Sequence, residues 1–104
     1  MTTFDEREMA FENKFAHDEE LRFRTEARRN RLLGLWAAGL MGKSAEEAVV
    51  YAKAVVASDI AQSGDEDVFR KVADDLGTKS DTVTIRTKMA ELLTEAKRQM
   101  MTES

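Results

Sequence analysis

The sequence predicts an all-α fold, a single bundle of helices. The chain of 104 residues contains no proline and only five glycines, so long helices joined by short turns are favoured over many short strands. Apolar residues recur at spacings of three and four along most of the chain, as they do on one face of a helix. The only alternating segment, Thr82–Ile85, is too short to predict a strand.

The first predicted helix is unusually long. Thr3 and Glu6 have the spacing of a capping box, and no helix breaker follows until Gly34. Helical pattern continues to about Leu40, and Gly42 is a candidate stop. A helix of more than thirty residues is long for a small globular protein, so we expect a bend within it. Since glycine is costly inside a helix, Gly34 predicts close contact with the backbone of a neighbouring helix.

Three more helices follow, each with a start or stop signal of its own. Ser44–Glu47 is a second capping box, and Ser63–Glu66 is a third that follows the end of the preceding helix. Gly77 is expected to end the short helix that this third box begins. Asp81 is the predicted cap of the last helix, whose apolar face is again spaced by three and four. These apolar faces form the expected core together with five residues of the first helix: Leu32, Leu33, Leu35, Trp36 and Leu40.

Charge is unevenly distributed along the chain. Net charge is -4 and the sequence pI is about 5.1, so there is no general attraction to nucleic acid. Residues 1–20 hold seven acidic and two basic residues, whereas residues 22–31 hold five arginines and one acid. This basic band is either a solvated helix face or a site for phosphate or another anion. The candidate anion-binding residues are Arg24, Arg28, Arg31 and Lys43.

Several classes of chemistry lack the residues that they need. There is no cysteine and one histidine, His17, so thiol catalysis, a Ser-His-Asp triad and a metal site are not expected. Gly42-Lys43-Ser44 resembles the end of a phosphate-binding loop, but the segment before it is helical and its first glycine is replaced by Ala37. We therefore expect no enzyme and no cofactor. No apolar run is long enough to span a membrane, and the acidic N-terminus is unlike a signal peptide, which predicts a cytoplasmic protein.

An aromatic stripe marks the N-terminal segment. Phe4, Phe11 and Phe15 lie within about 40° of one another on a helical wheel, and charged residues occupy most of the remaining positions. The acidic polar face disfavours binding to an anionic membrane. Two interpretations stay open: the stripe packs on the protein's own core, or it anchors the segment in a groove of a partner protein. Either a helical arm or a disordered arm that folds on binding is compatible with this composition.

These segments closely resemble the zeta subunit family, the alphaproteobacterial inhibitors of the F-type ATP synthase. The resemblance covers nearly the whole chain, and its N-terminal block is the most specific part. The matching segments are Phe4–Glu8, Ala10–Glu12, Lys14–Ala16, Asp18–Leu21, Ala27–Ala38, Tyr51–Lys53, Gly64–Val72, Ile85–Arg86, Lys88–Met89 and Glu91–Leu93.

The resemblance implies a four-helix bundle with a long N-terminal helix whose first part is a mobile inhibitory arm. Carried onto this sequence, residues 1–18 are the arm and residues 19–104 are the bundle. The arm is expected to insert between catalytic subunits of the synthase head, contacting alpha, beta and gamma subunits, and to block rotation in the direction of ATP hydrolysis. The residues implied to bind the partner are Phe4, Asp5, Arg7, Phe11, Glu12, Lys14 and Phe15.

The resemblance also implies a peripheral position on the cytoplasmic side of the membrane-bound synthase. We expect a monomer when the protein is free, without nucleic acid and without insertion into the membrane. Two alternatives compete with this interpretation. The first is a small helical protein that binds adenine nucleotide through the basic residues and does not inhibit. The second is a regulator or assembly partner of an unrelated complex.

Overall fold

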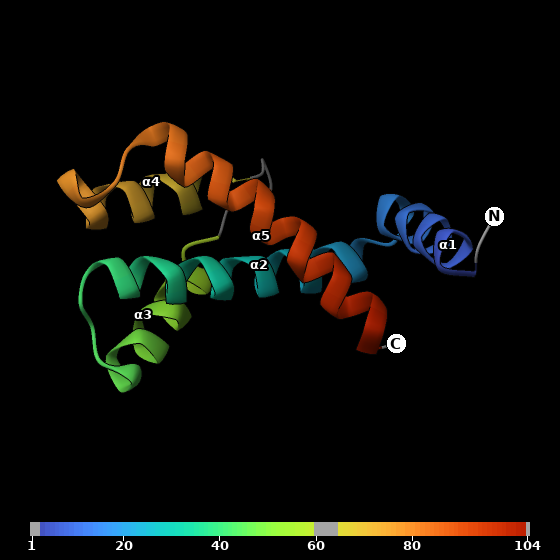
Figure 1. Cartoon of the computed structure of the whole chain (residues 1–104), viewed down its shortest axis with the longest axis horizontal. Coiled ribbons are helices and arrows are strands. Elements are labelled where there is room, and N and C mark those ends of the chain that lie inside the picture. The colour runs from blue at the N-terminus through green and yellow to red at the C-terminus, as the bar shows by residue number, and fades with distance from the viewer. Residues whose placement is uncertain (1–2, 60–64, 104) are drawn as a thin grey trace.

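Five α-helices build the computed structural model, which describes residues 3–59 and 65–103 (Figure 1). No strand occurs within these two ranges, which confirms the all-α class. The number of helices differs from the predicted four, because the long N-terminal helix is divided in two. The helices are α1 (Thr3–His17), α2 (Glu19–Leu40), α3 (Ala45–Ala57), α4 (Glu66–Leu76) and α5 (Thr82–Glu103), with a 3₁₀ turn at Gly77–Lys79.

The break between α1 and α2 lies at Asp18. Its backbone is extended, with φ of -108° and ψ of 104°, and its side-chain Oδ1 accepts a hydrogen bond from the backbone N–H of Leu21 at 3.1 Å. Asp18 is therefore the N-cap of α2, a position that aspartate strongly favours. Glu19 and Glu20 follow in the first turn, where negative charge suits the helix dipole. The expected bend is confirmed, whereas the prediction of one continuous helix to Leu40 is wrong at this residue.

The turn between α2 and α3 is made by the residues predicted to make it. Gly42 has a φ of 72°, and the N–H of Lys43 donates to the carbonyl of Ala38 at 3.1 Å, as in a Schellman motif. Ser44 and Glu47 then form a complete capping box, each side chain accepting from the other's backbone N–H. These bonds explain Gly42-Lys43-Ser44 as a helix stop and a helix start, so no phosphate-binding loop is formed.

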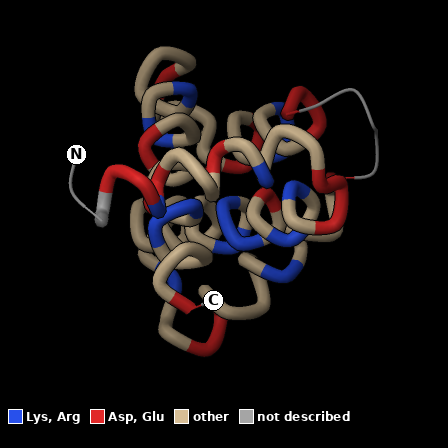
Figure 2. Tube along the Cα trace, turned by 90° about the vertical axis from the view of Figure 1, so that its right-hand side faces the viewer, with Lys and Arg blue, Asp and Glu red and all other residues tan. Residues whose placement is uncertain are grey.

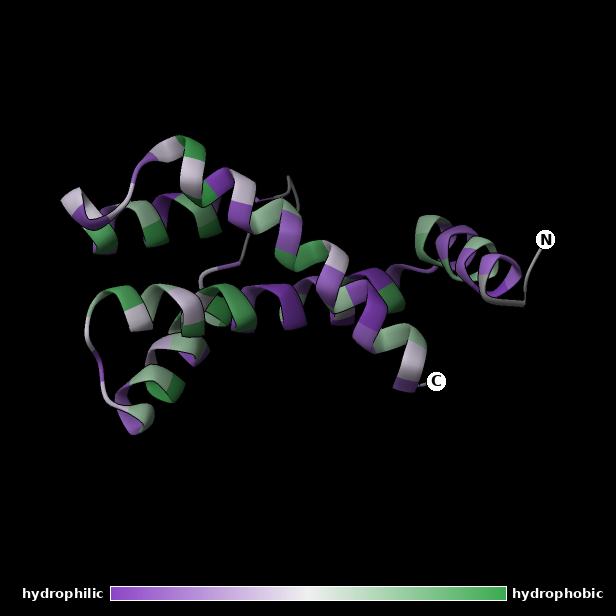
Figure 3. Cartoon of the chain, in the orientation of Figure 1, coloured by the Kyte–Doolittle hydropathy of each residue, from purple (hydrophilic) through white to green (hydrophobic). Residues whose placement is uncertain are grey.

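The core forms around the C-terminal half of α2, with α3 on one side and α4 and α5 on the other (Figure 1). Helix α3 is mostly hydrophobic along its length (Figure 3). Leu40 is 44% exposed at the last turn of α2, so its predicted place in the core is wrong. The buried cluster is Leu33, Ala37, Ala38, Tyr51, Val55, Val68, Val72, Leu76, Ile85 and Met89.

The later helix ends agree with the sequence signals in two of three cases. Gly77, with a φ of 54°, ends α4, and the Asp81 side chain caps α5 by accepting from the N–H of Thr84 at 2.8 Å. Helix α4 begins at Glu66 with Asp65 at its N-cap position, two residues after the predicted cap at Ser63. Ser63 itself lies outside the described residues.

Helix α1 lies away from this core, at the far end of a molecule that measures 45 × 26 × 26 Å. It is joined to the N-terminal end of α2 and lies near the C-terminal end of α5 (Figure 1). None of the buried core residues belongs to α1. Within the described part of the chain, no helix is both long and apolar enough to cross a bilayer.

Replacing Gly34 by alanine tests the closest helix contact. A Cβ at Gly34 would lie 2.7 Å from the Cα of Ala52, so α2 and α3 would have to move apart. We expect Gly34→Ala to lower the free energy of unfolding by about 1–2 kcal/mol, overpacking outweighing the better helix propensity. Gly39 of the same helix has no heavy atom within 4 Å of the position that a Cβ would take. Gly39→Ala should therefore raise the free energy of unfolding by up to about 1 kcal/mol.

Urea unfolding of both variants and of the unchanged protein, followed by circular dichroism, measures this difference. Equal effects of the two substitutions would contradict the close approach of α2 and α3.

Candidate functional site: helix α1 and its contact with α5

The aromatic stripe of α1 brings two rings together. Phe11 and Phe15 are stacked, with ring centroids 6.4 Å apart and an angle of 22° between the ring planes. Both side chains are half-buried. The predicted alignment of these two residues on one helix face is confirmed. The side chain of Phe4, the third predicted member, lies outside the described residues.

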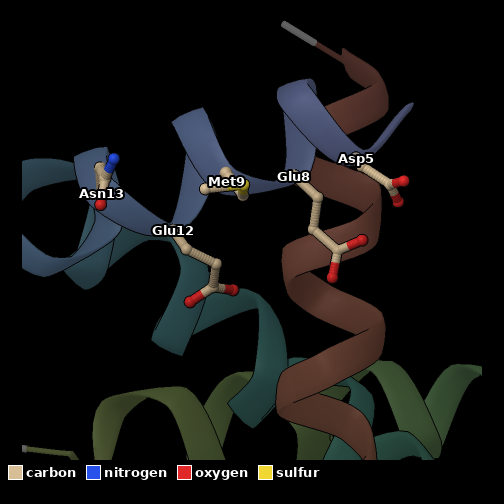
Figure 4. A pocket seen from close by; sticks show the side chains of 5 residues that line it. All are labelled: Asp5, Glu8, Met9, Glu12 and Asn13. Carbon is tan, nitrogen blue, oxygen red and sulfur yellow. The ribbon is translucent and has the colours of Figure 1, made fainter. Parts of the chain in front are cut away.

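A second face of α1 is acidic. Asp5, Glu8 and Glu12 project from one side of the helix, with Met9 between them, and line a shallow recess that Asn13 completes (Figure 4). Acidic residues also dominate the start of the described trace (Figure 2). Met9 is 58% exposed, an unusual position for a large apolar side chain. This face therefore combines negative charge with one apolar side chain, that of Met9, which is largely exposed to solvent.

The remaining charged residues of the predicted arm are exposed. Arg7 and Lys14 both lie in the solvent-exposed part of α1, and so does His17 in its last turn. The backbone carbonyl of Lys14 accepts a hydrogen bond from the N–H of Asp18 at 2.8 Å, which closes the last turn. Exposed charges of this kind set the register and the rate of an encounter with a charged surface more than its strength.

Helix α1 contacts α5 through Lys97. The ammonium Nζ lies 3.4 Å from Oε2 of Glu12 and 4.3 Å from the centre of the Phe15 ring. A groove of about 420 Å³ remains between the two helices; its lining includes Glu8, Phe11 and Met101. Sequence reasoning missed Lys97, because the contact joins residues 85 positions apart and no local pattern reveals it.

The C-terminal half of α5 is held in place by a set of charged contacts. The guanidinium of Arg28 on α2 donates two hydrogen bonds to the carboxylate of Glu103, one of them 2.9 Å long, and a third to Gln99. The Arg28 guanidinium holds the pKa of Glu103 below its usual range. Hydrogen bonds first from Arg98 and then from Gln99 lower the pKa of Glu95 to about 2. The part of α5 that carries Lys97 is therefore fixed to α2.

The four candidate anion-binding residues are not brought together. Arg24 and Arg31 are exposed on α2, whereas Arg28 is engaged by Glu103. Lys43 lies beyond the opposite end of α2, with its Nζ 5.8 Å from the centre of the Tyr51 ring. At 1.5 Å per residue, the nine residues from Arg31 to the end of α2 already span about 13 Å. No single anion can contact the whole set.

One arginine of the basic band is buried instead of solvated. Arg29 is 1% exposed, and its guanidinium donates to Asp65 at 2.7 Å and to the side-chain oxygen of Asn30 at 2.7 Å. Asn30 in turn donates to Asp59 at 3.0 Å. This cluster fixes the end of α3 and the start of α4 to α2. The sequence signal is weak: Arg29 lies four residues before the core residue Leu33, so the buried stripe of α2 continues into polar positions.

Glu26 borders this cluster, and its surroundings disfavour its ionised form. Partial burial raises the pKa of its carboxyl, and the nearby carboxylates of Asp65 and Asp59 raise it further. Three carboxylates around one arginine do not form a metal centre. Among residues 3–59 and 65–103, no group of three His, Cys, Asp or Glu side chains is arranged to hold a metal ion.

The chain is similar to known proteins in both sequence and structure. A family model described as ATPase inhibitor subunit zeta matches residues 1–99. A solved structure, determined by solution NMR, is similar with a TM-score of 0.75 and 46% sequence identity; the match covers 81% of this chain and 99% of that chain. No curated protein sequence gives a significant match.

Glu26→Gln tests the electrostatics of the buried cluster. Because its folded pKa is raised, ionised Glu26 weakens the fold at neutral pH, and removing the charge should help. We expect a gain of up to about 0.5 kcal/mol at pH 7, small because water screens a half-exposed group. The gain should fade as pH drops below the ordinary pKa of 4.5, where folded and unfolded chains both carry protonated Glu26.

Urea unfolding at pH 7 and at pH 3.5 measures the gain, with Glu8→Gln as the control, since that carboxylate lies on α1 outside the cluster. A gain of equal size at both pH values would contradict the electrostatic cause.

Proposed function

The chain belongs to the ATPase inhibitor subunit zeta family, and we propose that helix α1 is the part that inhibits. Membership of this family implies that the protein binds the F-type ATP synthase and inhibits its ATP hydrolysis, as a regulatory subunit without catalytic activity of its own. Residues 1–18 act as the inhibitory arm in this proposal, and residues 19–104 act as the domain that anchors it.

The arm inserts between catalytic subunits of the synthase head. Its contacts are with alpha and beta subunits, and with the rotating gamma subunit where the helix reaches the centre. A helix lodged in a cleft that one rotational state offers stabilises that state, and the rotation cycle stops without any chemical step. The bundle stays outside, at the cytoplasmic face of the membrane-bound synthase, and holds the arm in orientation.

The single observation that carries this proposal is the separation of α1 from the core. Every buried residue of the core cluster belongs to α2, α3, α4 or α5, and the extended backbone at Asp18 joins α1 to them. Helix α1 can therefore change its position without opening the core. A helix with an aromatic stripe that the core does not use is suited to a groove on a partner.

Two kinds of contact are assigned to the arm. The stacked rings of Phe11 and Phe15 supply large apolar side chains, which are typical anchors in buried pockets of a partner. The exposed charges around them form the rim of the interface, where they select orientation and register. The proposed rim residues are Asp5, Arg7, Glu12 and Lys14.

Phe11→Ala tests the role of the aromatic stripe. Truncating a central aromatic anchor commonly costs about 1.4–2 kcal/mol of binding, so the concentration needed for half-inhibition should rise about 10–30-fold. The measurement is ATP hydrolysis by the isolated synthase head with increasing amounts of the added protein.

Phe23→Ala is the matched control. Phe23 is also an aromatic residue and is 71% exposed, but it lies on α2 outside the proposed arm. We expect it to inhibit like the unchanged protein. If Phe23→Ala weakens inhibition and Phe11→Ala does not, the inhibitory surface lies on α2 and the proposal is wrong.

A further inference from the structure

Lys97 is a residue of α5 that contacts α1. One ammonium group meets two groups of the arm, the carboxylate of Glu12 and the ring of Phe15. These two residues are three positions apart on α1 and so lie on neighbouring parts of one helix face. The Lys97 side chain is 24% exposed, so water screens its two contacts only in part.

A groove borders the Lys97 contact. It has a volume of about 420 Å³, lies between α1 and α5, and is lined by Phe11, Thr94 and Met101. Beside it, Lys97 makes an ion pair with Glu12 and a cation–π contact with Phe15. Each contact of this kind shifts an equilibrium by only about two- to fivefold. Such a contact holds α1 in place and is still easily opened.

The face that Lys97 holds is the face that the proposed function assigns to the synthase. The Phe15 ring cannot lie against Lys97 and fill a pocket of the head at the same time. The same exclusion applies to the Glu12 carboxylate. Docking on α5 and insertion into the head are therefore competing states of α1.

We propose that Lys97 holds the inhibitory face of α1 against α5 in the free protein, so that this face is covered. We call this contact of Lys97 with Glu12 and Phe15 the catch. The inference rests on the proposed function, since it assumes that this face binds the head. Only the open fraction of the protein can insert, so the apparent affinity for the head is the affinity of the open arm multiplied by that fraction. The catch therefore sets how strongly the protein inhibits without being part of the inhibitory surface.

The position of Lys97 is well defined by its neighbours on α5. Arg98 donates to Glu95 at 2.9 Å, and Gln99 donates to the same carboxylate at 2.9 Å. Arg28 of α2 holds Glu103 at the end of the helix. Lys97 thus projects toward α1 from a helix whose end is joined to α2.

Lys97→Ala tests the catch with two independent measurements. A free helix of 15 residues is marginal in water, so α1 should exchange its amide hydrogens faster once it is released from α5. We expect exchange in α1 to accelerate about threefold and exchange in α2–α5 to stay unchanged. With the isolated synthase head, the concentration for half-inhibition should fall about threefold.

Lys88→Ala is the matched control, because Lys88 is a lysine of the same helix that pairs with Glu91 and not with α1. It should change neither measurement. If the amide hydrogens of α1 exchange at the same rate in Lys97→Ala as in the unchanged protein, the proposal is wrong. It is also wrong if Lys97→Ala inhibits equally or more weakly. If none of the proteins inhibits, the proposed function fails, while hydrogen exchange alone still decides whether Lys97 holds α1.

Discussion

The rest of the structure depends on the close packing of α2 against α3 at Gly34. The missing side chain at this position lets the two backbones approach, and the core cluster forms around the same half of α2. Helix α2 has 22 residues and is about 33 Å long, so its N-terminal half extends beyond that core. This half is joined to the end of α5 by Arg28 and Glu103. Helix α1 is therefore attached at the end of the molecule that lies away from the described core cluster.

This geometry links stability to function. The described core and the buried cluster around Arg29 lie within residues 19–103, the part that we propose to be the anchor, and neither includes a residue of α1. A helix that inhibits by insertion has to leave one environment for another, and it can do so only if the fold does not depend on it. Lys97 contacts α1 through an ion pair and a cation–π contact, and no residue of α1 belongs to the described core cluster. The fold thus separates a stable part from a part that can exchange partners.

Sequence reasoning predicted the features that local chemistry determines. Gly42, Ser44 and Asp81 act as stop and cap because their conformations and side-chain bonds involve residues within a few positions. The contact at Gly34 was predictable because glycine destabilises the interior of a helix, and close packing against a neighbouring helix can offset that effect. Asp18 was not recognised as a cap, since it lies among charged residues that would suit an unbroken helix equally well. The burial of Arg29 and the contact of Lys97 depend on segments far apart in the sequence. Only a weak local signal, the helical spacing from Leu33, points to Arg29, and none points to the contact of Lys97.

The central claim is that α1 inhibits and the rest of the chain anchors it. The most direct measurement compares ATP hydrolysis by the isolated synthase head in the presence of the full chain and of a chain that begins at Asp18, which keeps the cap of α2. The thermal unfolding of both proteins shows whether the shorter chain is still folded, as the absence of α1 from the core cluster predicts. We predict that the full chain inhibits and the folded shorter chain does not. Equal inhibition by both would contradict the claim and would place the inhibitory surface on the bundle.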